Sequence, residues 1–301
     1  MAPLAEQSIN TVKKKDSKFK KMFKFVKKNP TGFLGIILVF ISVTCALFAT
    51  WIAPMDPMES TLTHRLTPPS WVESGEDSEY FLGTDQIGRD LLSRIIHGAT
   101  ISLKVGVFGA LLALVIGTIL GLLAGFFGKW LDDFIMRAAD VQLAFPFILF
   151  AIVIMSVLGT GIWKIIIILG LTYWVGFARL IRSQVISLRE LEYIQAAKSV
   201  GGTNFQIIRK HILPNIASSI LVLSTLYIAE FILLEASLTF LGLGVDPTIP
   251  SWGGMLADSR NYIESAWWTV TFPGLAIMFT VLGFNLLGDW LRDKYDPNLN
   301  V

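Results

Sequence analysis

Long apolar runs, separated by shorter polar segments, follow one another along most of the chain. A helix needs about 20 mostly apolar residues to cross the roughly 30 Å of hydrocarbon in a bilayer. Six runs reach or approach this length, at residues 33–53, 105–128, 141–158, 162–180, 215–241 and 265–288. The pattern therefore predicts an all-α polytopic membrane protein with six transmembrane helices.

The composition agrees with this prediction. Of the 301 residues, 53% are hydrophobic and only 16% are charged, and the mean hydropathy is +0.61. A soluble domain of this length rarely carries so few charges. Cys45 is the single cysteine, which excludes a disulfide within the chain and a cysteine-based metal site.

Residues 1–30 form a polar stretch rich in lysine. A secretory signal peptide has a short basic start and a short apolar core. Here the basic stretch is long, and the apolar run after it, in segment 31–54, is long enough to span a membrane. We therefore expect an uncleaved cytoplasmic tail followed by the first transmembrane helix. Its lysines are expected to attract anionic membrane lipid, and binding to nucleic acid is the disfavoured alternative.

Charged residues are divided unevenly between the two sides of the predicted membrane. With the tail inside, segment 55–100 is extracytoplasmic, and its acidic residues outnumber its basic ones. The loop 182–214 is then cytoplasmic and is rich in arginine and lysine, as the positive-inside rule requires. The five-helix core therefore covers residues 101–292, and the tail at 293–301 is cytoplasmic like the N-terminus.

The cytoplasmic loop carries helix signals of its own. Two capping-box patterns occur, Ser187 to Glu190 and Thr203 to Gln206, and Gly201-Gly202 lies between them. Apolar residues recur at helical spacing after each box, and Pro214 closes the segment. We predict two short amphipathic helices joined by a glycine turn, whose apolar faces need a partner or the membrane surface to cover them.

The second span contains small residues at every fourth position. They are Gly109, Ala113, Gly117, Gly121 and Gly125. A stripe of this kind lets two helix backbones approach closely in lipid. The stripe is expected to pack within the chain, or alternatively to meet a partner subunit or line a pathway.

Two acidic residues lie in the fifth span. Glu230 and Glu235 are five residues apart and so point about 140° from one another. Intramembrane acids are functional candidates because an unpaired buried charge is costly. For Glu235, near the outer end, we hypothesise a gate or an inter-subunit contact, or equally a buried pair with a basic residue. For Glu230 we favour a structural hydrogen bond.

The end of the outer segment also carries charges. Asp90 and Arg94 have the spacing of an exposed ion pair within a helix, and apolar positions between 91 and 96 indicate one face of an amphipathic outer helix. A structural role is favoured for these charges, and direct contact with a substrate or a binding protein is the alternative.

The cytoplasmic loop resembles the Glu-Ala-Ala loop of ABC importer permeases. The matching residues are Gln195-Ala196-Ala197-Lys198-Ser199-Val200-Gly201, followed by His211-Ile212-Leu213-Pro214. In that family the first helix of the loop docks in a groove of the ATPase subunit. The family's leading glutamate is Gln195 here, whereas histidine at position 211 is common in the peptide-importer branch. The resemblance therefore assigns ATPase coupling chiefly to Ala196, Ala197 and Gly201.

Three further stretches resemble the C-type permeases of dipeptide, oligopeptide and nickel importers. The outer-segment motif contains Gly83, Thr84, Asp85, Gly88, Arg89 and Asp90. The second stretch runs from Glu235 to Gly244 and continues at Ser251-Trp252-Gly253, and the third runs from Asn285 to Asp296-Pro297. The four motifs occur in order and cover most of the chain from about Gly32 onward.

The resemblance implies a type I ABC importer transmembrane domain in the bacterial inner membrane, working as a permease half. Its expected partners are a homologous second permease subunit, two cytoplasmic ATPase subunits and an extracytoplasmic peptide-binding protein. It implies no enzyme activity and no cofactor for this chain, with ATP and magnesium on the partner subunits. Di- or oligopeptides are the expected cargo, and nickel or another small solute is the alternative. No histidine lies in a predicted span, which favours peptide over a metal path.

Three rival classes fit less well. A membrane-embedded enzyme needs a converging nucleophile, carboxylate pair or metal site, and no such pattern is found. An ion-driven secondary transporter often shows inverted repeats and broken helices, and no comparable repeat is found. A complete ABC protein needs a phosphate-binding Gly-x-x-x-x-Gly-Lys-Ser/Thr loop, which does not occur in the sequence.

Overall fold

The computed structural model describes residues 29–72 and 79–295. Helices make up nearly all the regular structure of this part, and an isolated bridge between Thr84 and Asp90 is the β-type pairing found in it. The lysine-rich tail and the Asp296-Pro297 end of the third C-type stretch lie outside the described residues. The helices, in chain order, are α2 (Pro30–Leu47), α3 (Ala49–Ile52), η1 (Leu62–His64), α4 (Leu91–Phe127), α5 (Lys129–Leu143), α6 (Phe147–Leu158), α7 (Ile162–Arg189), α8 (Glu192–Ser199), α9 (Asn204–Ile207), η3 (Ile208–Ile212), α10 (Leu213–Phe240), α11 (Trp252–Asp258), η4 (Arg260–Tyr262) and α12 (Trp268–Tyr295).

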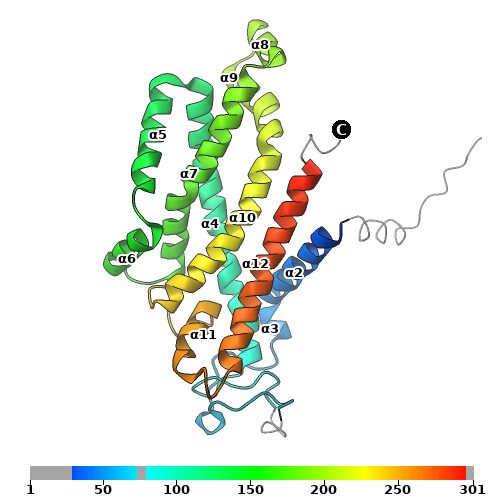
Figure 1. Ribbon diagram of the computed structural model, residues 1–301, viewed down its shortest axis with the longest axis vertical. Helices are drawn as coiled ribbons and strands as arrows, with labels where there is room; N and C mark the ends of the chain where they lie inside the picture. The colour runs from blue at the N-terminus through cyan, green and yellow to red at the C-terminus, as the bar shows by residue number, and fades with distance from the viewer. Residues whose placement is uncertain (1–28, 73–78, 296–301) are drawn as a thin grey trace, which may run out of the picture.

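Long helices run side by side through the molecule (Figure 1). Among the described residues, five helices are long and apolar enough to cross a membrane, and the α5–α6 pair gives a sixth span if it is counted as one. The helix pair α8–α9 and the C-terminal end of α12 lie toward one end of the bundle, and α11 lies toward the other (Figure 1). The predicted six-span, all-α fold is confirmed.

The third span differs from the straight helix predicted at 141–158. It consists of α5 and α6, which meet at an angle of 84°. Pro146 precedes α6, and because proline disfavours helical geometry in the residue before it, the helix breaks there. The Arg182 guanidinium on α7 donates to both carboxylate oxygens of Asp132 on α5, at 2.5 and 2.6 Å. Further along, the Trp174 indole donates to Gln142 at 2.7 Å.

Several spans are longer than predicted, among them the second and the fourth. α4 begins at Leu91 rather than at 105, so the predicted outer helix and the second span are one helix of 37 residues. The Asp90 side chain caps its start by accepting from the Ser93 N–H at 2.8 Å, and Gly128 ends it with a φ of 63°. α7 continues past residue 180 to Arg189, because no glycine or proline interrupts that stretch.

The stripe of small residues on α4 packs within the chain. A side chain at Gly117 would collide with Phe177 Cβ and the Trp174 carbonyl oxygen, and one at Gly121 would come within 2.7 Å of the Ala178 carbonyl oxygen. All three of these contacted residues belong to α7. The stripe therefore allows the close approach of α4 and α7, and the intrachain alternative is confirmed.

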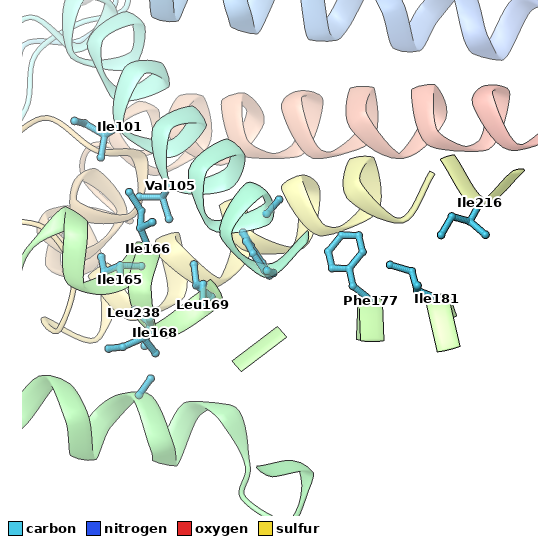
Figure 2. Packing of buried hydrophobic residues seen from close by; sticks show 14 of the residues in the cluster. Ile101, Val105, Ile165, Ile166, Ile168, Leu169, Phe177, Ile181, Ile216 and Leu238 are labelled. Atoms are coloured by element: carbon cyan, nitrogen blue, oxygen red, sulfur yellow. The ribbon is translucent and has the colours of Figure 1, made fainter. Parts of the chain in front are cut away.

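Apolar side chains fill the space between α4, α7 and α10. Figure 2 shows the labelled residues of this cluster, from Ile101 and Val105 on α4, through Leu169 and Phe177 on α7, to Ile216 on α10. A second cluster joins α4 to α11 and α12. Because lipid supplies no hydrophobic drive between helices, this close packing is what holds the spans together.

Candidate functional site

The candidate coupling site is the helix pair α8–α9, which protrudes beyond the ends of α7 and α10 (Figure 1). α8 ends in a Schellman turn, in which the Gly202 N–H donates to the Ala197 oxygen at 3.0 Å and the Gly201 N–H donates to the Lys198 oxygen at 3.1 Å. Gly201 has a φ of 91°, in the left-handed region that favours glycine. The predicted glycine turn is confirmed, and Gly201 has the conformation that makes it.

One of the two predicted capping boxes forms. The Thr203 hydroxyl accepts from the Gln206 N–H at 3.3 Å, and the Gln206 side chain accepts from the Thr203 N–H at 3.2 Å. The box predicted at Ser187 is wrong, because α7 continues through it and the Ser187 hydroxyl donates to the Ser183 oxygen. α8 begins after Leu191 without a side-chain cap.

The second predicted helix is not separate from the fifth span. α9, η3 and α10 form one helix from Asn204 to Phe240. Pro214 lies inside this continuous helix, at the second residue of α10 and directly after η3, so the helix runs through the proline instead of ending at it. η3 is a π-helical turn, in which the Leu213 N–H donates to the Ile208 oxygen five residues back. α9 is therefore joined to the fifth span by a continuous helix.

Isoleucines anchor the helix pair to the bundle. Ile194 on α8 and Ile207 on α9 are buried, as is Ile212 in η3. The Tyr193 ring lies against the His211 ring, with centroids 6.1 Å apart, and so ties α8 to η3. His211 thus contacts α8 through Tyr193, and the roles of His211 and Leu213 in the coupling loop stay predictions.

The outer side of the helix pair is exposed and partly apolar. Val200 is 89% exposed and Phe205 is 70% exposed. Ala196 is exposed as well, and Ala197 is half-buried. The predicted apolar face is thus only partly covered by the described chain, and its uncovered part faces away from the bundle. Exposed apolar residues at a protruding tip are typical of a protein contact.

Gln195 has a local role that a glutamate could not fill. Its side-chain amide donates to the Glu190 backbone oxygen at 3.2 Å, across the turn between α7 and α8. An ionised carboxylate has no proton to donate. Gln195 therefore occupies the place of the family's glutamate on α8, but it makes a hydrogen bond to Glu190 that an ionised glutamate could not make.

The outer-segment motif folds into a buried clasp. Gly83 and Gly88 have φ values of 80° and 81° and make its turns. The Thr84 hydroxyl accepts from the Thr67 N–H at 2.8 Å, and the Trp268 indole on α12 donates to the Thr84 oxygen at 3.1 Å. The clasp fixes the segment before α4 to the start of α4 and to α12.

The charges of this motif form a network that differs from the predicted one. Asp85 Oδ2 accepts from Arg89 Nε at 2.6 Å and lies 3.5 Å from Arg94 Nε. Arg89 also lies 3.5 Å from Asp258 on α11. The predicted exposed pair of Asp90 with Arg94 is wrong, because Asp90 caps α4 and all four motif charges are buried. Burial favours the structural role over contact with a cargo.

Replacing Asp85 by Asn is expected to destabilise the outer end of the bundle. Removing one partner of a buried ion pair leaves uncompensated charge and costs about 3–5 kcal/mol, here on Arg89 and Arg94. The measurement is the unfolding midpoint of the purified chain in detergent. Asp56→Ala, which removes an exposed turn carboxylate, is the matched control. Equal midpoints for the two variants would contradict the clasp.

Glu235 is fully buried between α4 and α10. Its carboxylate oxygens accept from the Ser102 hydroxyl at 2.8 Å and the Thr239 hydroxyl at 2.9 Å. No basic side chain in the described residues forms an ion pair with it, so the predicted buried pair with a basic residue is wrong. A role for Glu235 as a gate or an inter-subunit contact stays a prediction.

Glu230 makes the structural hydrogen bond that was predicted for it. The Tyr173 hydroxyl on α7 donates to Glu230 Oε1 at 2.9 Å. No local sequence pattern points to Tyr173 or Ser102, because each lies in a different span from its acidic partner. Thr239 could have been found, since it is one helical turn from Glu235.

No group of three His, Cys, Asp or Glu side chains in the described part of the chain could hold a metal ion.

In the loop after α10, the Thr248 hydroxyl and backbone N–H donate to Asp246 and hold the pKa of that carboxyl below its usual range. At the start of α11, the Trp252 indole donates to the Ile95 oxygen at 2.9 Å. These contacts organise the loops around α11.

Comparison with known proteins assigns the family. A profile described as "binding-protein-dependent transport system inner membrane component" matches residues 117–301. A second, described as the N-terminal TM domain of oligopeptide transport permease C, matches residues 17–69.

Curated relatives extend over nearly the whole chain. A dipeptide transport system permease protein DppC of Alkalihalophilus pseudofirmus is 45% identical over 94% of this chain and 91% of its own length. A di/tripeptide transport system permease protein DppC of Pseudomonas aeruginosa is 42% identical over 94% of this chain and 93% of its own length. A glutathione transport system permease protein GsiD of Pectobacterium atrosepticum is 41% identical over 87% of this chain and 85% of its own length.

The family match and the apolar helices agree on an integral inner-membrane protein with the transmembrane fold of ABC importers. Members of this family are transport subunits rather than enzymes, and they work with an ATPase and a substrate-binding protein. The chain therefore belongs to the family of binding-protein-dependent transport system inner membrane components.

Proposed function

We propose that this chain is one permease half of a peptide importer and that α8 couples it to a cytoplasmic ATPase. The observation that carries the coupling is the exposed apolar tip at Val200 and Phe205, joined to the bundle by a helix that continues into the fifth span. A partner seated on this tip covers apolar surface that the described chain leaves open. The names of the relatives support peptides as the cargo.

The proposed assembly contains one homologous permease, two cytoplasmic ATPase subunits and an extracytoplasmic peptide-binding protein. ATP and magnesium are held by the ATPase subunits, and this chain holds neither. Both termini and the α8 tip are proposed to be cytoplasmic. The basic residues at this end of the molecule, such as Lys198, Arg209 and Lys210 near the tip and Arg292 on α12, support that orientation.

In the proposed mechanism, closure of the ATPase pair displaces α8. Two residues separate α8 from α7, and η3 joins α9 to α10 without a break. Displacement of the tip therefore acts on two spans at once and switches the pathway between outward and inward access. The π-helical turn in η3 is of the kind that recurs at functional sites inside helices.

Deleting Lys210 from η3 is expected to abolish peptide uptake while leaving a folded chain. Removal of one residue closes the π-helical turn as a regular α-helical one, so the irregular turn between α9 and α10 is lost while the helices on either side keep nearly the same relative orientation. Uptake into proteoliposomes and the yield of assembled complex are measured together. Lys210→Ala keeps the residue count and is expected to retain uptake. Normal uptake by the deletion variant would contradict the proposed transmission.

The function is tested by reconstituting the four kinds of subunit in proteoliposomes and supplying labelled dipeptide, a longer peptide or nickel on the outside. ATP-dependent uptake of peptide, competed by unlabelled peptide, is the expected result. Uptake of nickel alone would support the small-solute alternative. Uptake driven by an ion gradient without ATP would support a secondary transporter and overturn the proposal.

A further inference from the structure

The two acidic residues of α10 have opposite environments. Both oxygens of Glu235 accept hydroxyl hydrogen bonds, and the side chain is fully buried. Glu230 is only partly buried, and Tyr173 is the one hydrogen-bond donor found for it among the described residues, on Oε1. Its second oxygen, Oε2, therefore has no protein donor in the described chain. An open acceptor on a membrane span needs a partner, since lipid provides none.

No cation of the neighbouring helix α7 is placed to be that partner. Lys164 donates to the Leu158 backbone oxygen, Arg179 to Asp140, and Arg182 to Asp132. Arg189, the remaining basic residue of α7, donates to Glu190 and to the Gly125 oxygen. None of the ion pairs in the described part of the chain includes Glu230. The described residues thus leave this carboxyl group without an ion-pair partner, and a ligand with a positive charge would complement it.

Tyr173, whose hydroxyl bonds this carboxylate, belongs to a cluster of aromatic rings. The Tyr173 ring meets Tyr227 edge-on at 5.3 Å and Phe231 at 4.9 Å between centroids. Gly176 leaves room for the Tyr227 hydroxyl, which a side chain at that position would strike. A carboxylate next to tyrosine rings offers an ionic partner beside aromatic groups, a combination that suits an ammonium group.

We propose that Glu230, next to Tyr173 and Tyr227, binds the terminal ammonium group of the peptide during its passage. This inference rests on the proposed function. Peptides differ in every side chain, but nearly all share an N-terminal amine, which is largely protonated at neutral pH. A single carboxylate can therefore serve a permease that accepts many peptide sequences.

The test measures equilibrium binding of a labelled dipeptide to the detergent-solubilised complex of both permeases and both ATPase subunits, without the binding protein. For the wild type, N-acetylation of a competing dipeptide is expected to weaken its binding about tenfold or more, as loss of a charged hydrogen bond does. Glu230→Gln is expected to weaken binding of the free-amine dipeptide by a similar factor. It is also expected to remove the difference between the free and acetylated forms, and Glu230→Asp is expected to restore part of it.

Glu235→Gln is the comparison variant. It is expected to lower the yield of folded complex while keeping the preference for the free amine. If Glu230→Gln weakens both competitors equally, or neither, Glu230 does not bind the amine and the inference fails. If it prevents assembly with the second permease, the carboxylate pairs with that subunit, and the inference fails likewise.

A second experiment measures the amount of peptide transported per ATP hydrolysed, with saturating binding protein. The complex that carries Glu230→Gln is expected to transport about tenfold less peptide per ATP than the wild type. Undiminished transport per ATP would overturn the inference. Failure of the wild-type complex to bind or transport any peptide would instead refute the proposed function.

Discussion

Ala196→Trp is expected to reduce ATP hydrolysis stimulated by the binding protein about tenfold or more, and peptide uptake with it. Ala196 lies on the exposed side of α8, which the described chain leaves uncovered. Inserting a large side chain into a packed contact costs about 1–3 kcal/mol, and about 1.4 kcal/mol corresponds to a factor of ten in binding. The same change leaves the internal packing of α8, which depends on Ile194, in place.

The measurement is ATPase activity of the reconstituted complex with and without binding protein, together with the amount of ATPase subunit that copurifies. Ala138→Trp is the matched control, since Ala138 is an exposed alanine on α5, away from α8. The control is expected to keep stimulation near the wild-type level. Full stimulation of the Ala196 variant would contradict docking of the ATPase on this face.

Gly117→Val is expected to remove most of the folded chain from the membrane. Any side chain at Gly117 would strike Phe177 Cβ and the Trp174 carbonyl oxygen. Part of the contacted surface is backbone, which cannot turn aside, and overpacking of this kind costs about 3 kcal/mol at the upper end of the usual range. α4 and α7 would have to separate along the stripe that brings them together.

The yield of monodisperse protein and its unfolding midpoint in detergent measure this effect. Gly274→Val is the control, because a side chain at Gly274 meets nothing within 4 Å. It tests the helix propensity of valine without a clash. If the two variants had the same yield and midpoint, the close approach of α4 and α7 would not be what holds the bundle together.

The spans could be predicted because bilayer thickness sets a length that apolar runs either reach or do not. Their interruptions were harder to predict. Pro146 was visible in the third run, yet the sharp bend there also depends on contacts such as Gln142 with Trp174. Conversely, Pro214 suggested the end of a helix, but it lies in the first turn of α10, after a π-helical turn that no residue pattern announces.

Local hydrogen bonds could be predicted only where the helix actually began. The Thr203 box formed because the Gly201 turn ends α8 just before it. The Ser187 box has the same residue pattern but is in the middle of α7, where packing of the continuing helix outweighs the preference of a serine for a cap.

The hydrogen-bond partners of the acidic residues in α10 could not be predicted from the sequence. The partner of Glu235 is Ser102, on another span, and Glu230 is bonded by Tyr173 on α7. The partners are 133 residues apart in the first pair and 57 in the second, and no local sequence pattern links residues so far apart. In the structure, both oxygens of Glu235 accept hydrogen bonds, whereas one oxygen of Glu230 has no donor among the described residues. The family motif alone had directed attention to Glu235.

The central claim, that the tip of α8 seats on the ATPase, can be tested by site-directed photocrosslinking. Cys45 is the only cysteine, so Cys45→Ala with Val200→Cys leaves one thiol, at a position whose native side chain is 89% exposed. A benzophenone maleimide attached there, in the assembled complex, is predicted to crosslink to an ATPase subunit identified by mass spectrometry. Val157→Cys, whose native side chain on α6 is 80% exposed, is predicted to give no such product. A fully labelled Val200→Cys chain that never crosslinks to the ATPase would contradict the account.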